Sequence, residues 1–336
     1  MTMTDSVAKR ENERTALEIL SRTKALVRPA LEAASLRLSP DIQPLVRHHL
    51  AAGGKHVRAC LALLSANAAG ADNDVGLVGA VAIELVHNFS IIHDDIIDRD
   101  VERRHSPTLW AKYGVGPALI AGDALSTLAF QLLLETSTFE RVAAAQCLAE
   151  AQQAMIAGQS ADIASEDKLS LTVEECLQME AGKTGALLAC AASIGAILAG
   201  ADVSVISALS DYGEHLGLAF QAIDDLLGVW GDSSITGKPV GNDLRLRKKT
   251  LPISIANAKG FDVFVDAPST PDQELSDTEV AEAMVLLDEC GARYETLEFA
   301  TKELEAALAA LDGATLADTA RVELAAIARY VIERDQ

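Results

Sequence analysis

Hydrophobic residues recur at intervals of three and four along most of the chain, which is the spacing of helices that bury one face. The clearest run comprises Val81, Leu85, Val86, Phe89 and Ile92. No stretch alternates apolar and polar residues over the length of a strand, and the sequence has no repeat of fixed period. The pattern predicts an all-α protein.

The predicted elements follow from where this periodicity starts and stops. Residues 1–15 are polar and are expected to be disordered, and an amphipathic helix follows with Leu17, Leu20 and Val27 on one side. Polar segments at 160–172, 231–249 and 262–277 are expected to be loops. Further helices are predicted at residues 45–50, 57–69, 118–135, 139–158, 173–180, 185–198, 203–227 and 251–258, after the turn at 70–74, and from 277 to 334. We expect a single domain over residues 1–336.

Composition narrows the range of functions. Hydrophobic residues make up 49% of the chain and aromatic residues only 4%, which favours closely packed helices over sheets. The formal net charge of −21 argues against nucleic acid, which is bound by surplus Lys and Arg. An anionic substrate would therefore need local cationic clusters or a metal ion.

The cysteines and apolar runs bear on the compartment. Five cysteines are scattered without metal-binding or redox spacing, as is typical of buried thiols in a reducing compartment. The N-terminal residues lack the apolar stretch of a signal peptide. The longest uncharged run, residues 184–201, is rich in Ala and Gly, and a buried core helix is favoured over a membrane span. We expect a cytoplasmic protein without a membrane span.

Three carboxylates end the central predicted helix, at Asp94, Asp95 and Asp98. On a helix, Asp94 and Asp98 leave the same face, and Asp95 borders that face. Such like charges repel unless a cation lies between them, and Mg²⁺ suits them because substrate phosphates can complete its shell. Taken alone, such a motif is more often an acidic helix end on a surface. The other motifs are therefore needed to decide between a metal site and a surface helix end.

A second acidic pair, Asp224-Asp225, also ends an apolar helical stretch. Two such helices facing each other would form a carboxylate-lined mouth able to hold several Mg²⁺ ions around a diphosphate. Two unrelated acidic helix ends are the alternative.

Three cationic motifs change the balance between these interpretations. Each begins a predicted helix, where backbone N–H groups and the helix dipole favour an anion, or lies in a loop beside an acidic helix end. A charge run is usually only a solvated face, but in so acidic a chain we favour a function. The motifs are Gly53-Gly54-Lys55-His56-Val57-Arg58, Gly182-Lys183-Thr184, and a loop with Lys238 and Arg245-Leu246-Arg247-Lys248-Lys249.

Together these motifs resemble the trans-isoprenyl diphosphate synthases, the polyprenyl synthase family. The resemblance extends from about Gly53 to Pro252. It implies a single-domain helical bundle of the isoprenoid synthase type, with the active-site cavity between helices, and a homodimer. It rests on Asp94-Asp95-Ile96-Ile97-Asp98 with Arg103-Arg104, on Phe220-Gln221 with Asp224-Asp225, and on Gly237-Lys238 and Lys248-x-Thr250-Leu251-Pro252.

The resemblance implies a role for each matching residue. Several Mg²⁺ ions would bind Asp94, Asp98 and Asp224. Isopentenyl diphosphate would contact Lys55, Arg58, His87 and Arg104, although a lone histidine on an apolar helix is more often a core residue. The allylic diphosphate would contact Arg103, Lys183, Thr184, Gln221, Lys238 and Lys248. The catalytic set would comprise Asp94, Asp95, Asp98, Arg103, Lys183, Asp224 and Lys238.

The implied reaction is ionisation of the allylic diphosphate, attack by the double bond of isopentenyl diphosphate, and loss of a proton to the released diphosphate. No protein general base is assigned. Phe89 and the small Ser90, ahead of the first motif, resemble a geranylgeranyl diphosphate synthase; a farnesyl product is the nearer alternative. Helical geometry alone would not place Phe89 at the product pocket.

Two other functions use the same fold. A class I terpene cyclase would not need the second diphosphate set, and a non-catalytic regulatory subunit should have lost aspartates of the first motif. The sequence also departs from the family at three positions: Gly228 stands where a third aspartate is common, His105 where glycine is common, and Ala59 where proline is common. We expect an aspartate at position 228 to be tolerated.

Overall fold

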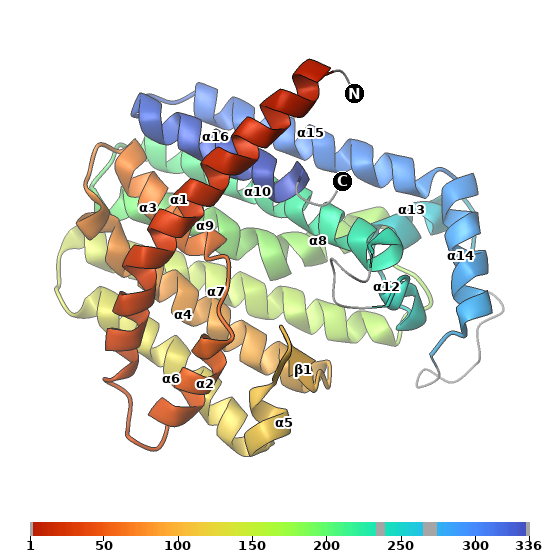
Figure 1. Cartoon of the computed structure of the whole chain (residues 1–336), viewed down its shortest axis with the longest axis horizontal. Helices are drawn as coiled ribbons and strands as arrows, with labels where there is room; N and C mark the ends of the chain where they lie inside the picture. Colours follow the sequence, from red (N-terminus) through yellow and green to blue (C-terminus); the bar gives the residue numbers. More distant parts are fainter. Residues whose placement is uncertain (1–2, 233–238, 265–273, 334–336) are drawn as a thin grey trace. The chain divides into compact units, whose positions relative to one another are not determined.

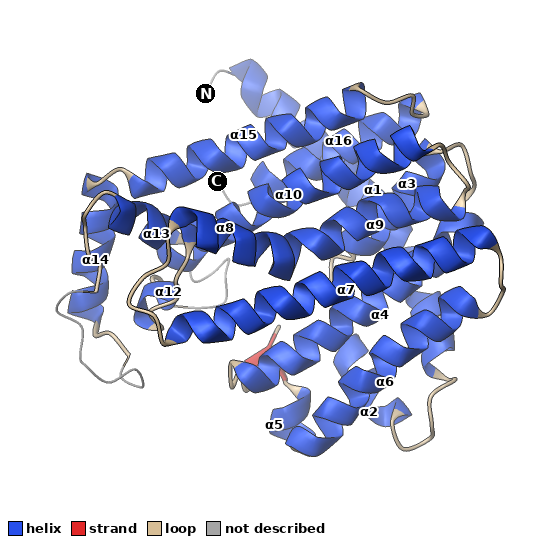
Figure 2. Ribbon diagram, turned by 180° about the vertical axis from the view of Figure 1, so that it is seen from behind, coloured by secondary structure: helices blue, strands red, loops and turns tan. Residues whose placement is uncertain are grey.

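Within the residues that it describes, the computed structural model consists of helices and one short hairpin (Figures 1 and 2). It describes residues 3–232, 239–264 and 274–333. The all-α prediction is confirmed. The chain divides into two compact units, unit 1 with residues 1–152, 189–210 and 311–327, and unit 2 with residues 153–188, 211–310 and 328–336. The single domain expected from the sequence stays a prediction.

Most of the helices and both strands belong to a single unit. Unit 1 holds α1 (Met3–Ser35), α2 (Gln43–Ala51), α3 (Val57–Ala68), α4 (Asn73–Ile97), β1 (Glu102–Arg103), β2 (Ser106–Pro107), α5 (Leu109–Tyr113) and α6 (Val115–Leu134). Unit 2 holds α8 (Val173–Glu180), the π-helical turn η1 (Ala181–Gly185), α12 (Asn242–Arg245), α13 (Leu251–Ala258) and α14 (Asp277–Glu289). The unit boundaries fall within or next to the ends of α7 (Phe139–Glu166), α9 (Ala186–Leu198), α10 (Val203–Trp230), α15 (Ala292–Asp312) and α16 (Asp318–Glu333).

Small residues allow the helices of unit 1 to approach closely. A Cβ atom added at Gly76 on α4 would lie 2.9 Å from the Ala66 Cβ on α3. A Cβ at Gly195 on α9 would collide with the Ala62 carbonyl oxygen. The Gly195 N–H instead donates a hydrogen bond to Ser65 Oγ at 3.0 Å. The abundance of alanine and glycine in the sequence thus corresponds to close helix packing, as predicted.

Among the residues that the structure describes, three helical segments are long and apolar enough to cross a membrane, judged by length and composition alone. In Asn73–Ile97 and Val173–Leu198, 61% and 67% of the most apolar window is buried inside the protein. In Val115–Leu134 only 39% of that window is buried. Burial accounts for the apolar character of the first two segments, whereas α6 keeps an exposed apolar side. The absence of a membrane span stays a prediction.

The predicted bounds of two helices are confirmed. Both α8 and α13 begin and end at the predicted residues. The start of α8 is fixed locally, because the Glu175 N–H donates to Thr172 Oγ1 at 3.1 Å and the Thr172 N–H donates to Glu175 Oε2 at 2.9 Å. This reciprocal pair satisfies two donors that would otherwise lack a partner at the helix start.

Parts of two predicted loops are helical, so the predictions are wrong there: segment 231–249 contains α12, and segment 160–172 overlaps α7. The expected loop 160–172 begins inside α7, which continues to Glu166. Within this helix, Ser165 Oγ donates to the Asp162 carbonyl at 2.6 Å. The expected disordered start is described from Met3 onward as part of α1, and its disorder stays a prediction. Alanine, lysine, arginine and glutamate in residues 8–13 favour helix without any apolar face.

Candidate active site

The first acidic motif forms the last turn of α4 in unit 1. The Asp98 N–H donates to the Asp94 carbonyl at 2.8 Å, so the two side chains lie one turn apart as predicted. Asp95 is only 2% exposed, and its Oδ1 accepts a hydrogen bond from Arg103 Nε at 2.6 Å. Burial raises the pKa of Asp95, and the Arg103 guanidinium opposes that shift. Asp95 therefore holds Arg103, while Asp94 and Asp98 are accessible to solvent.

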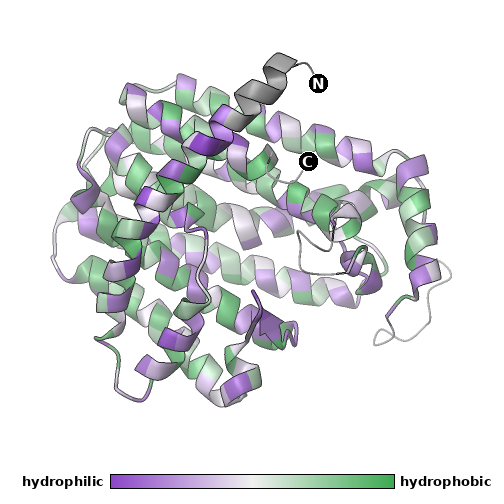
Figure 3. Ribbon diagram, viewed as in Figure 1, coloured by the Kyte–Doolittle hydropathy of each residue, from purple (hydrophilic) through white to green (hydrophobic). Residues whose placement is uncertain are grey.

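A tight hairpin directs the two arginines to different partners. The chain turns between β1 and β2 at Arg104 and His105, whose φ angles of 52° and 60° are unusual for residues other than glycine. The left-handed backbone explains why glycine is common at position 105. Arg103 reaches Asp95, whereas Arg104 Nη1 lies 3.1 Å from where a Cβ on Gly54 would be. The hairpin is strongly hydrophilic (Figure 3).

Basic side chains from three segments of unit 1, which are α2, α3 and the hairpin, lie near His87 on α4. Arg58 Nη1 lies 3.4 Å from His87 Nε2. Burial of the His87 ring, together with the charges of Arg58 and Arg104, holds its pKa well below the usual range. Burial likewise lowers the pKa of His49 to about 4. Arg58, His87 and Arg104 of the predicted isopentenyl diphosphate set thus act on one another, with Lys55 exposed at the start of α3. We name Lys55, Arg58, His87 and Arg104 the cationic cluster.

Glu84, which was not predicted as a site residue, fixes the loop that carries the cationic cluster. This carboxylate on α4 is 4% exposed. Its Oε2 lies 2.9 Å from His56 Nδ1, and its Oε1 accepts a hydrogen bond from the Ala59 N–H at 3.3 Å. His56 has a left-handed φ of 53°, so these contacts hold an unusual backbone at the start of α3. The signal was a single acidic residue within the apolar run at 80–86.

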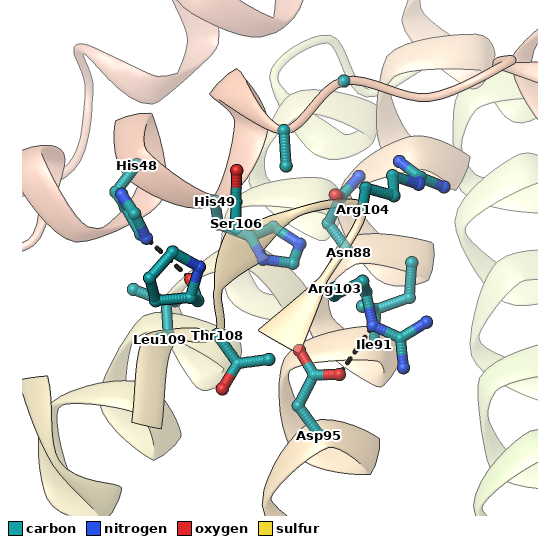
Figure 4. A pocket seen from close by; sticks show the side chains of 13 residues that line it. His48, His49, Asn88, Ile91, Asp95, Arg103, Arg104, Ser106, Thr108 and Leu109 are labelled. Atoms are coloured by element: carbon teal, nitrogen blue, oxygen red, sulfur yellow. Dashed lines mark hydrogen bonds and ion pairs between the residues drawn. The ribbon is translucent and has the colours of Figure 1, made fainter. Parts of the chain in front are cut away.

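A pocket open to solvent lies beside the hairpin in unit 1 (Figure 4). Asp95, Arg103 and Arg104 of the predicted site line it, whereas Lys55, Arg58 and His87 do not. Its other polar lining residues were not predicted from the sequence; they are His48, His49, Asn88, Ser106 and Thr108.

In unit 2, a line of hydrogen bonds joins three segments. Thr184 Oγ1 on η1 donates to Gln221 Oε1 at 2.8 Å. Gln221 Nε2 donates to Asp225 Oδ1 at 2.9 Å, and the Leu251 N–H at the start of α13 donates to Asp225 Oδ2 at 2.8 Å. We call this the Thr184–Gln221–Asp225 network. Thr184 and Gln221, predicted from separate motifs, thus lie together, and their role toward the allylic diphosphate stays a prediction.

Lys183 lies on a backbone irregularity and has a carboxylate partner. It belongs to η1, and π-helical turns are frequent at functional sites. Its Nζ lies 2.5 Å from Asp162 Oδ2 on α7, a residue that was predicted to lie in a loop. The two backbones touch at glycines: a Cβ at Gly158 would collide with the Lys183 backbone, and one at Gly182 would lie 3.0 Å from the Ala154 carbonyl oxygen.

Gly228 has a structural reason that the sequence did not show. A Cβ at this position would lie 2.5 Å from Asp243 Cγ and closer still to Asp243 Oδ2. The carboxylate of Asp243 thus occupies the space where a side chain at 228 would be, next to the turn that holds Asp224. The expectation that aspartate is tolerated here is revised.

The remaining predicted residues lie apart from these contacts. Lys238 lies outside the described residues, and Lys248 is exposed after α12. Phe89 is 8% exposed and packs edge-on against His93, with ring centres 4.7 Å apart. His93 in turn lies where a Cβ on Gly122 would collide with it. Ser90 Oγ donates to the His87 carbonyl at 2.9 Å.

The donor chemistry of the acidic motifs fits Mg²⁺. Asp94, Asp98 and Asp224 offer only carboxylate oxygens, which this ion prefers. Over residues 3–232, 239–264 and 274–333, no three His, Cys, Asp or Glu side chains are grouped so that they could hold a metal by themselves. Mg²⁺ does not need such a cage, because it usually keeps waters and takes phosphate oxygens. The three metal ligands stay predictions.

Comparison with known proteins decides the family. The sequence pattern of the polyprenyl synthetase family matches residues 39–266, which is more than half of the chain. The chain belongs to the polyprenyl synthetase family. The predicted resemblance to trans-isoprenyl diphosphate synthases is thereby confirmed.

Individual relatives match almost the whole length of this chain. A (2E,6E)-farnesyl diphosphate synthase of Mycobacterium tuberculosis is 42% identical, over 96% of this chain and 94% of that protein. A geranylgeranyl diphosphate synthase of the same organism is 36% identical, over 94% of this chain and 93% of that protein. The crystal structure of a polyprenyl synthetase from Streptomyces coelicolor A3(2) matches with a TM-score of 0.88 and 43% identity, over 94% of this chain and 99% of that chain. Relatives of different product length are thus similar to this chain.

Proposed function

We propose that this polyprenyl synthetase is a Mg²⁺-dependent trans-prenyltransferase that condenses isopentenyl diphosphate with an allylic diphosphate, head to tail. The observation that carries the proposal is the cationic cluster. Burial first, and then the charge of neighbouring arginines, lowers the pKa of His87 and Arg104, so a polyanion such as a diphosphate would stabilise these groups. Family membership and both aspartate motifs support the same activity.

The two aspartate motifs would bind Mg²⁺, and their basic neighbours would bind the allylic diphosphate. Mg²⁺ bound at Asp94, Asp98 and Asp224 would supply stabilisation of negative charge on the departing diphosphate. Arg103, oriented by Asp95, and Lys183, oriented by Asp162, would hold the allylic diphosphate. Fixed charges of this kind stabilise developing charge without reorganising during the reaction.

The direct test is incubation with isopentenyl diphosphate and each allylic starter, followed by mass analysis of dephosphorylated products. A terpene cyclase would ignore isopentenyl diphosphate and release a hydrocarbon or alcohol, and a regulatory subunit would produce nothing. In a second arm, Lys55→Ala and Arg58→Ala should raise the KM for isopentenyl diphosphate more than that for the allylic substrate. One lost charged contact is worth about 1.5–3 kcal/mol, or roughly ten- to hundredfold. Lys24→Ala on the exposed side of α1 is the matched control.

For the product we propose geranylgeranyl diphosphate, on the strength of Phe89 followed by Ser90. Phe89 packs edge-on against His93, and this contact supports Phe89 as a fixed wall of the pocket for the growing chain. Farnesyl diphosphate is the second candidate, favoured by the name of the 42% identical relative. The chain length of the main product separates the two.

We further propose a cytoplasmic homodimer. All five cysteines are free thiols, which supports a reducing compartment. Apolar side chains are exposed on α6 and the start of α7, with Ile120 56%, Leu134 48% and Phe139 84% exposed. An apolar surface of this kind supports association with a second copy. Light scattering of the purified protein tests it, and Ile120→Glu should favour monomers.

A further inference from the structure

Two of the five cysteines are in contact within unit 1, although 43 positions separate them in the sequence. Cys147 Sγ on α7 lies 3.4 Å from Cys190 Sγ on α9. Cys147 is half-buried, whereas Cys190 is only 3% exposed. The contact therefore joins a partly exposed thiol to a buried one, and neither thiol has a role in the function proposed above.

The contact gives the two thiols different chemical character. A hydrogen bond joins the two sulfur atoms. When Cys147 is ionised, the Cys190 S–H donates to it, which lowers the pKa of Cys147 and raises the pKa of Cys190. Burial and the charge of Glu150 oppose the shift at Cys147, and Ser193 Oγ, 4.0 Å from Cys147 Sγ, supports it. Because the thiolate is the reactive form of cysteine, Cys147 is the better nucleophile of the two.

The other three cysteines are buried and have different surroundings. Burial raises the pKa of Cys60 to about 12 and also raises the pKa of Cys176, so both thiols keep their protons. Cys290 Sγ donates to the Leu287 carbonyl at 3.5 Å. Buried thiols of this kind react slowly, and they serve as internal controls.

We propose that Cys147 and Cys190 form a reversible oxidation site, at which a hydroperoxide oxidises Cys147 and Cys190 then closes a disulfide bond between α7 and α9. Redox-sensitive cysteines are typically accessible thiolates with a second thiol beside them, and this pair has both properties. The sulfur atoms need to approach by only about 1.4 Å to reach bonding distance. In a reducing compartment such bonds are usually transient, which agrees with the free thiols of the structure.

The reaction has two steps that together consume one hydroperoxide. The Cys147 thiolate attacks one peroxide oxygen, the O–O bond breaks, and the leaving oxygen takes up a proton, so that Cys147 becomes a sulfenic acid. The Cys190 sulfur then attacks the Cys147 sulfur, the S–O bond breaks, and the hydroxide leaves as water with the proton of Cys190. The two thiols lose two electrons, and the peroxide gains them.

The second thiol also limits damage to the first. A sulfenic acid that meets another peroxide becomes a sulfinic acid, which ordinary thiol reductants do not reverse. Cys190 already lies in contact with Cys147, so its attack does not depend on an encounter in solution. The disulfide bond is open to reduction, and the pair can return to its free thiols.

The test exposes the purified full chain to hydrogen peroxide, followed by peptide mapping with mass detection under non-reducing conditions. We expect peptides joined through Cys147 and Cys190 in the wild type, and their separation by dithiothreitol. Cys290→Ala is the matched control and should form the same bond. In Cys190→Ala the bond cannot close, so dimedone, a reagent for sulfenic acids, should label Cys147. This variant should also accumulate about tenfold more sulfinic acid at Cys147 than the wild type.

A wild type in which Cys147 becomes sulfinic acid without a cross-link would overturn the proposal. A bond between other cysteines or between two chains would overturn it too, as would an unmodified Cys147 under conditions that oxidise free cysteine. The wild-type map needs no variant, so the test does not depend on the folding of Cys190→Ala. No substrate is present either, and the result is independent of the proposed function.

Discussion

Replacing Gly228 with alanine should destabilise the protein, although most Gly→Ala changes within helices stabilise. The added Cβ would lie 2.5 Å from Asp243 Cγ and 3.2 Å from Asp243 Cβ. Carbon atoms prefer about 3.5–4.0 Å, so the Asp243 carboxylate must move by about 1 Å. The backbone cannot easily follow, because the Gly241 N–H donates to the Val229 carbonyl at 3.1 Å and ties the start of α12 to α10.

The two contributions to this change have opposite signs. Overpacking of this kind costs about 1–3 kcal/mol. The higher helix propensity of alanine relative to glycine raises the free energy of unfolding by roughly 0.8–1 kcal/mol. We therefore expect Gly228→Ala to lower the free energy of unfolding by about 1 kcal/mol, measured by urea denaturation followed by circular dichroism. Gly228→Asp should lose more, because two carboxylates about 4 Å apart repel by roughly 4 kcal/mol at an effective dielectric constant of 20.

Two further variants test the steric explanation. At Gly116 on α6 an added Cβ meets nothing within 4 Å, so Gly116→Ala should be neutral or stabilising. Removing the obstacle with Asp243→Ala should make a subsequent Gly228→Ala stabilising. If Gly228→Ala proves as stable as Gly116→Ala, or if it destabilises equally with and without Asp243, the steric explanation is refuted.

Three further predictions concern unit 1. Asp94→Ala and Asp98→Ala should each lower turnover by orders of magnitude and weaken its Mg²⁺ dependence, with an unchanged urea midpoint; near-normal turnover would remove the metal assignment. Phe89→Ser should lengthen the products and Ser90→Phe shorten them, as read by chromatography with mass detection; unchanged lengths in both would mean that another wall sets the length. His87 stays neutral when folded but takes up a proton when unfolded below about pH 6.5, so stability should fall as pH drops through that value, and less so in His87→Asn. Parallel slopes in the two proteins would contradict this.

Features set by local sequence were predictable. Thr172 and Glu175 form a capping box, and such reciprocal contacts span only three residues, so α8 could be placed from the sequence. The one-turn spacing of Asp94 and Asp98 follows from helical geometry alone. The family resemblance also rested on short motifs whose residues are close in the sequence.

Features that depend on distant partners were not predictable. Asp95 looked like a third member of an acidic face, but Arg103 holds it in a buried ion pair. Asp162 became visible as the partner of Lys183 only when α7 proved longer than predicted. Gly228 could be understood only beside Asp243, which lies in a segment expected to be a loop. In each case the deciding contact joins segments whose arrangement is a tertiary property.

The cationic cluster has a consequence for the life of the protein in a cell. Burial is the main cause of the lowered pKa of Arg104 and His87, and repulsion from neighbouring arginines adds to it when no anion is bound. Any diphosphate that binds only the folded chain relieves the repulsion and shifts the folding equilibrium, by about 2.7 kcal/mol at a hundred times its Kd. Marginal stability controls how quickly a protein is degraded. Cellular abundance of this protein should therefore rise with the supply of its own substrates.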